Sequence, residues 1–501
     1  MTKQFLNELI SFTQQKGFIW GPEPEIYGGS AGFYSFAPLG KLLKNNVENT
    51  IRRVFSNNDF FEVEFPIIMP KKVWEASGHL GGFTDAMIEC KKCKASFKVE
   101  QILEELFPDK KITDQKEFLK KNKVKCPSCQ TVLGSDIKQH NLMMKTNVGI
   151  DGEAYNRPET ATTTYLQFLR YYDFFRKKLP FGIFQIGNAF RNEISPRQHL
   201  LRTREFTQAE AQMFIFKDQK NNFSLFDKHK AKKMPLLDWK AHSKDKKPAM
   251  VSLKDAIDKK ILKNKAYAYF LNMTYRMFLE LEIPKDRIRI VQHSPEDKAF
   301  YAEDAWDIEV KLESFGWIEI CGVHDRTDYD LKQHAKHSGT NMEVLDENEK
   351  KEIPHVLEIA FGTGRLVFSL LDIYYKKMSA GEGKSILMMP VSMAPIKIAV
   401  FPLLRKPKLV ALAKKVHEEI SNGWLCKYDE TASIGKRYLR AAEEGIPFAV
   451  TVDFDSLDKK TVTIRDRDTE KQKRIAIKDV KTVIDSLILG DLKFKQIKEK
   501  L

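Results

Sequence analysis

Two Cys-x-x-Cys pairs restrict the fold of this chain more than any other feature of its sequence. Cys90-Lys-Lys-Cys93 and Cys126-Pro-Ser-Cys129 place four thiols in two chelating turns, with 32 residues between the pairs. Four thiolates suit tetrahedral Zn²⁺, and a site filled by four protein ligands has no position for a catalytic water. We therefore predict a structural zinc site in an insertion of residues 86–140, with free structural or redox-active thiols as the alternative.

Length, polarity and charge narrow the class of protein. A chain of 501 residues exceeds the usual size of one domain, so two or three domains are expected. The sequence has no run of ~18 apolar residues and no apolar signal core at its N-terminus, which predicts a soluble cytoplasmic protein without a membrane segment. The net charge of +15 suits a nucleic-acid partner, although lysine-rich surfaces also serve solubility alone.

The spacing of apolar residues divides the chain into two large folding units. Helical spacing over 39–56, followed by a strand, opens a first domain of residues 1–85 that resumes at 141–390. Its strands and long helices predict an α+β fold built on an antiparallel sheet. Within it, residues 217–260 are rich in Lys and Asp and are expected to form a surface insertion that need not add to the core. Strands and helices alternate over 394–501, which predicts a separate α/β domain.

Three arginines and an aromatic residue lie on a predicted strand, loop and strand. These residues are Arg191, Arg202, Arg204 and Phe206. The forked guanidinium donors match phosphate oxygens, and a phenyl face can stack on a purine, so the segment suits a nucleoside triphosphate. A solvated hairpin with surface salt bridges is the alternative, because such ion pairs are common.

Three glutamates lie in apolar or turn-rich settings. They are Glu159 in RPET, Glu210 in TQAE and Glu358 in HVLEIAFG. Three converging carboxylates would hold the ammonium group of an amino acid, whereas burial without a cation would be costly. Separately, Gly362-Thr-Gly364-Arg365 opens a predicted helix, for which a tight turn is the simplest interpretation.

Across nearly its whole length the sequence resembles the glycyl-tRNA synthetases, dimeric class II aminoacyl-tRNA synthetases, in an archaeal-like form. The resemblance rests on PEIYGGSAGFYSFAPLG, KVWEASGHLGGFTD, RPET, FRNEISPRQ, REFTQAE and DRTDYDL. It implies the class II antiparallel sheet flanked by helices, followed by a C-terminal α/β anticodon-binding domain. It also implies ATP-dependent activation of glycine to glycyl-adenylate with Mg²⁺, transfer of glycine to tRNA(Gly), and a homodimer formed around the helix before Pro66.

The resemblance also implies roles for individual residues. Arg191 would contact the α-phosphate, Glu193 the adenine amino group and Arg365 the γ-phosphate, while Phe206 would stack on adenine and Glu319 would help place Mg²⁺. The implied catalytic residues are Arg191 and Arg365. The implied ATP-binding residues are Arg191, Asn192, Glu193, Leu201, Arg202, Thr203, Arg204, Glu205, Phe206, Glu319, Ile320, Gly362, Thr363, Gly364 and Arg365. The implied glycine-binding residues are Lys98, Glu159, Phe206, Thr207, Gln208, Ala209, Glu210, Glu358, Ile359, Ala360, Phe361 and Gly362.

Several positions depart from the family pattern, and two other functions compete with the implied one. Many members read RPETAQG where this chain has RPETATT at residues 157–163. Ala360 lacks the hydroxyl of a serine that is common there, and Lys98 stands where arginine is common.

A related synthetase for threonine, serine or proline is one alternative to the implied glycyl-tRNA synthetase function. A non-catalytic synthetase-like RNA-binding protein is the other, and it would be favoured by loss of Arg191 or Arg365, which are both present.

The C-terminal domain carries basic residues that permit contact with tRNA. A role in dimerisation or packing is the alternative for this domain. The basic residues are Lys406, Lys408, Lys414, Lys415, Lys436 and Arg437.

Overall fold

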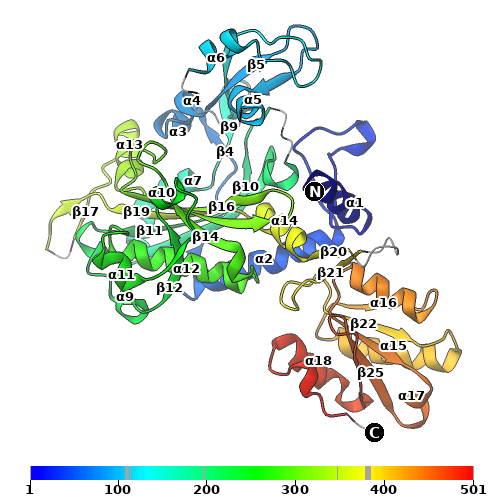
Figure 1. Ribbon diagram of the computed structural model, residues 1–501. Coiled ribbons are helices and arrows are strands. Elements are labelled where there is room, and N and C mark those ends of the chain that lie inside the picture. Colours follow the sequence, from blue (N-terminus) through cyan, green and yellow to red (C-terminus); the bar gives the residue numbers. More distant parts are fainter. Residues whose placement is uncertain are drawn as a thin grey trace.

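The computed structural model describes residues 2–107, 112, 114–194, 196, 198–346, 348–377 and 385–499. A central body is built on one large sheet, a small insertion rises from one side of it, and the C-terminal domain lies on another side (Figure 1). Among the described residues, no helix is long and apolar enough to cross a membrane.

Nine strands form the central sheet. All neighbours are antiparallel except two pairs near the edges, β12 with β14 and β10 with β3, which are parallel. This arrangement confirms the predicted α+β fold on an antiparallel sheet. In spatial order the strands are β13 (Ala249–Ser252), β12 (Lys233–Leu237), β14 (Ile288–Gln292), β15 (Asp304–Leu312), β16 (Gly316–Asp325), β19 (His355–Gly362), β11 (Glu205–Ile215), β10 (Phe181–Phe190) and β3 (Phe60–Glu62).

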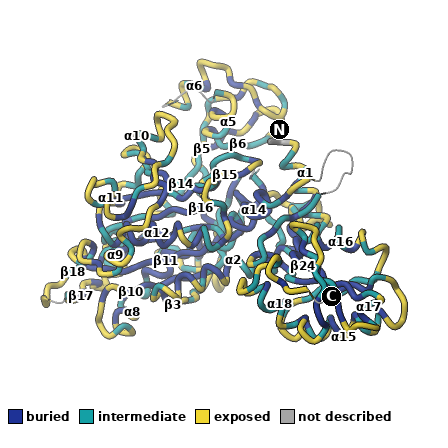
Figure 2. The backbone as a smooth tube through the Cα atoms, turned by 60° about the horizontal axis from the view of Figure 1, so that its bottom comes forward, coloured by how far each residue is buried: buried dark blue, intermediate teal, exposed yellow. Residues whose placement is uncertain are grey.

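Long helices cover one face of the sheet and bury its largest core. They are α2 (Pro38–Ser56), α12 (Lys265–Glu280) and α14 (Thr363–Tyr374). Alternate residues of β11, such as Ala209 and Met213, point into this core, because successive side chains of a strand face opposite sides. Figure 2 shows the resulting buried interior along the strands and these helices.

Shorter helices cover only one end of the opposite face. They are α7 (Ala161–Tyr165), α8 (Phe168–Phe174) and α13 (Tyr329–Ser338). Phe168 packs there against Phe181 and Phe214, which come from β10 and β11. These helices leave uncovered the part of the face around Phe206 and Gln208 of β11, which adjoins a cleft.

Residues 217–260 are part of the central body, and the expectation that they need not add to the core is wrong. β12 and β13 extend the main sheet, and Phe226, Met234 and Leu253 are buried in its core. Lys220 is also buried, with its Nζ 2.7 Å from Asp325. The segment is rich in Lys and Asp as a whole, but the short apolar pairs within it are buried in the core. The helices of this segment are α9 (Ser224–His229), α10 (Trp239–His242) and α11 (Leu253–Asp258).

The insertion forms a small three-stranded sheet with two helices. Its strands, in the order β6 (Ser96–Lys98), β5 (Thr84–Glu89) and β7 (Ile137–Asn141), carry α5 (Val99–Leu106) and α6 (Gln115–Asn122). A second small sheet joins it to the central body. That sheet and its helices are β4 (Ile68–Pro70), β9 (Gly152–Asn156), β8 (Met144–Val148), α3 (Lys71–Ala76) and α4 (His79–Gly82).

The C-terminal domain has its own core and a mixed five-stranded sheet. Its strands are β23 (Cys426–Tyr428), β22 (Ile398–Pro402), β24 (Phe448–Val452), β25 (Thr461–Asp466) and β26 (Gln472–Ala476), and its helices are α15 (Pro407–Ser421), α16 (Ile434–Glu443), α17 (Phe454–Asp458) and α18 (Val480–Leu489). The remaining elements are α1 (Thr2–Gln15) and three hairpins: β1 (Ile19–Trp20) with β2 (Ser35–Phe36), β17 (Val344–Leu345) with β18 (Lys351–Glu352), and β20 (Tyr375–Lys377) with β21 (Ser385–Leu387).

Candidate active site

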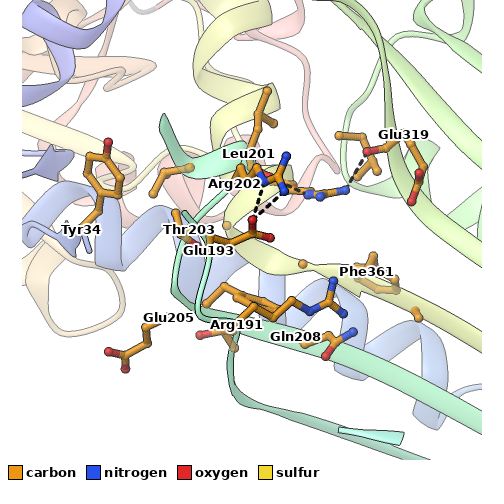
Figure 3. A pocket seen from close by; sticks show the side chains of 18 of the residues that line it. Tyr34, Arg191, Glu193, Leu201, Arg202, Thr203, Glu205, Gln208, Glu319 and Phe361 are labelled. Atoms are coloured by element: carbon orange, nitrogen blue, oxygen red, sulfur yellow. Dashed lines mark hydrogen bonds and ion pairs between the residues drawn. The ribbon is translucent and has the colours of Figure 1, made fainter. Parts of the chain in front are cut away.

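A cleft of about 210 Å³ opens on the uncovered face of the central sheet (Figure 3). It lies over β11, β16 and β19 and over the loop between β10 and β11. The fold thereby brings together most residues of the implied ATP site. The predicted residues that line the cleft are Arg191, Glu193, Leu201, Arg202, Thr203, Glu205, Phe206, Thr207, Gln208, Glu319, Ile320, Ala360, Phe361, Gly362, Gly364 and Arg365.

The Arg191 side chain is fixed between two aromatic rings. Its Cζ atom lies 5.3 Å from the ring centroid of Phe83 and 5.4 Å from that of Phe206. Its Nε donates a hydrogen bond to the Pro158 carbonyl oxygen at 3.1 Å. Because one edge of the guanidinium is held by the protein, the geometry leaves Arg191 ordered before an anionic ligand arrives.

Arg365 is held by backbone carbonyl groups on the other side of the cleft. Its Nε donates to the Leu201 oxygen at 3.0 Å and its Nη1 donates to the Glu319 oxygen at 3.1 Å. Near it, Glu193 accepts hydrogen bonds from Arg202, at 2.6 Å from Nη2 and 2.8 Å from Nε. The cleft therefore carries fixed positive charge on both sides, which suits a polyphosphate.

The three predicted glutamates converge below this cleft. Glu210 on β11 stands opposite Ala360 of β19, so Glu358 is a diagonal neighbour on the same face, and Glu159 comes just before α7. All three carboxylates already accept hydrogen bonds from buried or half-buried donors. The shortest are Thr162 Oγ1 to Glu159 at 2.6 Å, Thr160 Oγ1 to Glu210 at 2.5 Å and Tyr165 Oη to Glu358 at 2.5 Å.

The three carboxylates differ in charge. Burial raises the pKa of Glu210 to about 8, and the neighbouring Glu358 and Glu159 carboxylates add to this rise. Burial also opposes ionisation of Glu358, but the charge of Arg326, whose Nη1 is 3.0 Å away, and the contact with His324 together outweigh burial and lower that pKa. For Glu159, burial also opposes ionisation, but contacts with His79 and Thr162 and the charge of Arg326 together outweigh burial and lower the pKa. At neutral pH, Glu159 and Glu358 are therefore carboxylates, whereas Glu210 is mainly protonated.

Several predicted residues do not line the cleft. Ala209 and Ile359 point into the core on the helical face, because they alternate with Glu210 and Glu358 along their strands. Thr363 is buried and donates to Glu48 at 3.2 Å. Arg204 Nε donates to the Glu193 carbonyl oxygen at 2.8 Å. Asn192, which contacts the flank of the insertion, and Lys98, which lies within the insertion on β6, are also outside the lining.

Sequence reasoning missed residues that complete the glutamate cluster. Arg326 pairs with Glu358 and also with Asp330, at 2.7 Å and 2.8 Å from its Nε and Nη2. Thr160 and Tyr165 supply the hydrogen bonds described above. Arg326 stands in DRTDYDL, a segment that carried the family resemblance, and this was the only available signal for it.

The four cysteines of the insertion converge, as their spacing predicted. Their sulfur atoms lie within 4.8 Å of one another, with Cys90 to Cys129 at 3.6 Å and Cys93 to Cys126 at 3.7 Å. A tetrahedron with Zn–S bonds of about 2.3 Å has edges of about 3.8 Å. The donor set and these two edges fit a closed structural zinc site.

Among the residues that the structure describes, two other groups of side chains could hold a cation. His293, Asp307 and His324 offer atoms within 4.8 Å of one another on adjacent strands, and His324 also lines the cleft. The second group contains Asp325, but the ammonium of Lys220 already fills its centre. The first group adjoins Glu319, whose pKa is raised by burial and by the charge of Asp307. Carboxylates in this place could hold a hard divalent cation.

Comparison with known proteins identifies the family. A glycine–tRNA ligase from Methanocaldococcus jannaschii is 36% identical, over 96% of this chain and 98% of the relative. Another from Pyrococcus abyssi is 36% identical, over 97% and 98%. The chain belongs to the glycine–tRNA ligase family. Its function is that of a glycine–tRNA ligase, and the relatives name glycine rather than threonine, serine or proline.

Two further comparisons confirm the architecture of this ligase. Residues 397–487 match the family model for the anticodon binding domain, as predicted for the C-terminal domain. Prolyl-tRNA synthetase from Giardia lamblia, in complex with prolyl-adenylate, superposes with a TM-score of 0.63 at 14% identity over 98% of this chain and 80% of that chain. The enzyme from Cryptosporidium parvum gives 0.61 at 15%, over 98% and 78%. These structures confirm the class II fold.

Proposed function

We propose that the cleft activates glycine with ATP and that Arg191 and Arg365 hold the phosphates. A glycine carboxylate oxygen attacks the α-phosphorus, the bond to pyrophosphate breaks, and glycyl-adenylate forms. A ribose hydroxyl at the 3′ end of tRNA(Gly) then attacks the glycyl carbonyl carbon, and AMP leaves. The observation that carries this proposal is the pair of pre-fixed guanidinium groups on opposite sides of one cleft. Positioning and charge neutralisation supply the catalysis, so no covalent enzyme intermediate is needed.

Glu319 is the proposed contact for Mg²⁺. Its carboxylate lines the cleft close to Asp307 and to Arg365, and hard divalent cations prefer such oxygen donors. Mg²⁺ there would neutralise charge on the phosphates and on the departing pyrophosphate.

Glu159, Glu210 and Glu358 are the proposed contacts for the glycine ammonium. Glu210 and Glu358 lie on the sheet and Glu159 lies just before α7, close to Arg191, so an amino acid held by its ammonium would present its carboxylate to ATP. Ala360, opposite Glu210, and Gln208 form part of the adjoining lining. A side chain larger than hydrogen would meet this surface, which favours glycine.

This selectivity is tested by ATP–pyrophosphate exchange with single amino acids. Glycine should support exchange, whereas alanine, serine, threonine and proline should each support at most about a hundredth of that rate. The tested protein should be checked for folding and for zinc content. Exchange with another amino acid would reassign the substrate, and a folded, zinc-loaded protein without any exchange would contradict the catalytic proposal.

The glycine site should respond to pH through Glu210. Its carboxyl, with a pKa of about 8, is protonated below that pH, so the ammonium must displace a proton to gain the third negative charge. As the pH falls from 8 to 6, the KM for glycine should rise by up to about ten-fold per pH unit, and it should level off above pH 8. Steady-state exchange at fixed ATP measures this. Glu210→Gln should remove the slope, and a flat wild-type profile would contradict the assignment.

The zinc, tRNA and dimer contacts complete the proposal. We propose that the four cysteines bind Zn²⁺. We also propose that the protein is cytoplasmic, because the cytoplasm is a reducing compartment that keeps those thiols available for the metal. Lysines of the C-terminal domain would contact tRNA phosphates. Arg437 is excluded from that role, since it is buried and donates to the Leu403 and Ala432 carbonyl oxygens at 3.2 Å.

The proposed homodimer would cover β3, an edge strand on which Phe61 is 49% exposed. Light scattering, which measures the mass of the particle in solution, tests this dimer.

A further inference from the structure

The loop that joins β10 to β11 carries several of the proposed ATP-binding residues. The insertion contacts this loop near the loop's first residues. The Asn192 carbonyl oxygen accepts a hydrogen bond from His140 Nε2 at 3.0 Å. The Asn192 N–H donates to the carbonyl oxygen of Leu142 at 2.7 Å. His140 belongs to β7 and Leu142 follows that strand directly, so the flank of the insertion fixes the backbone next to Glu193.

The insertion contacts the same loop again near its end, through side chains. Asp85 on β5 lies 3.3 Å from Nη2 of Arg202 and 3.0 Å from Nζ of Lys98. Arg202 is in turn bonded to Glu193 on its Nε–Nη2 edge. Lys98, Asp85, Arg202 and Glu193 therefore form a chain of alternating charge that runs from the insertion into the cleft, where Figure 3 shows its last two members.

The carboxylates of this chain are shielded from water. The Asp85 side chain is 13% exposed and that of Glu193 is 9% exposed. Ion pairs at such positions are screened less than surface pairs, and each carboxylate would be left with an uncompensated charge if its partner were removed. Asp85 itself does not line the cleft, but it contacts Arg202, which does.

We propose that Asp85 is a positioning residue for ATP, through which the insertion sets the orientation of Arg202. This inference rests on the proposed function of the cleft. With Glu193 and Asp85 both on the Nη2 side of the guanidinium, Arg202 is restricted in the conformations that it samples before ATP binds. An arginine that is ordered in advance loses less freedom on binding phosphate, and this raises the affinity for ATP without contributing to the glycine site.

Asp85→Asn tests the proposal because it removes the charge and keeps the shape of the side chain. The KM for ATP in glycine-dependent pyrophosphate exchange should rise about ten-fold, as expected for the loss of one charge-assisted contact. The KM for glycine should stay within about two-fold, since the three glutamates lie elsewhere. Glu100→Gln is the matched control: Glu100 pairs with Lys98 at 3.3 Å but is 55% exposed and does not contact Arg202. It should leave both KM values unchanged.

A double variant separates positioning from general destabilisation. If Asp85 acts through Arg202, adding Asp85→Asn to Arg202→Ala should change the KM for ATP no further. Asp85→Glu, which keeps the charge, should restore part of the affinity and serves as the second variant if Asp85→Asn folds poorly. Melting temperature and zinc content establish that each variant is folded.

Two results would overturn the inference. One is an unchanged KM for ATP in folded Asp85→Asn, and the other is an equal rise in the Arg202→Ala background. Failure of the proposed function would look different, because the wild-type protein would then show no glycine-dependent exchange at all.

Discussion

Replacing Arg191 with alanine should reduce kcat for glycine-dependent ATP–pyrophosphate exchange by about a thousand-fold. Removing one pre-positioned donor from a developing anionic centre costs about 10²–10³ in rate, and a charged bidentate donor stands at the upper end of this range. Arg191 is held by Phe83, Phe206 and Pro158 before substrate binds, so water cannot reproduce its geometry.

Arg287→Ala is the matched control for this experiment. Arg287 also pairs with a carboxylate, that of Glu313, but it lies before β14 and outside the cleft. Its loss should leave exchange within about two-fold, because Arg287 contacts no residue of the cleft lining. Retention of more than a tenth of wild-type kcat in Arg191→Ala would remove Arg191 from its proposed role at the α-phosphate.

Substituting Cys126 with serine should abolish stoichiometric zinc binding and unfold the insertion. Cys126 is buried, and the core of the insertion packs around it together with Cys90, Ile102 and Leu119. A four-cysteine site contributes binding energy directly to folding, so the affinity for zinc should fall by at least about a thousand-fold. Elemental analysis measures the metal, and limited proteolysis between residues 90 and 129 reports the unfolding.

Cys426→Ser provides the control, because Cys426 lies in the C-terminal domain, outside the group of four. It should retain one zinc per chain and wild-type resistance to protease. A Cys126→Ser protein that also keeps one tightly bound zinc would show that the metal, if present, is held elsewhere.

Local patterns were sufficient for the elements that build the site. The helical spacing over 39–56 corresponds to α2, and the predicted strand that carries Phe206 corresponds to β11, on which Glu210 also lies. Both features depend on residues close together in sequence, and the family motifs then indicated which polar residues belong to one site.

Long-range pairings explain what the sequence could not reveal. Glu358 pairs with Arg326, and Arg202 pairs with Asp85. The residues that surround these side chains in the sequence indicate neither ion pair. The error over 217–260 has a related cause. Its lysines and aspartates suggested a solvated segment, but Lys220 finds Asp325 more than a hundred residues away and is buried with it. Composition describes side chains one at a time, whereas burial depends on the partner.

The parallel pairing of β3 with β10 has a consequence for synthesis of the chain. Phe60 pairs with Gly182, so the strand that follows α2 must wait for a partner made about 120 residues later. At roughly 5–20 residues per second of translation, the delay is about 6–24 s. During that time the apolar stripe of Leu43, Val47 and Ile51, which is fully covered in the finished protein, is exposed on the nascent chain. Helix α2 is thus made early and covered late.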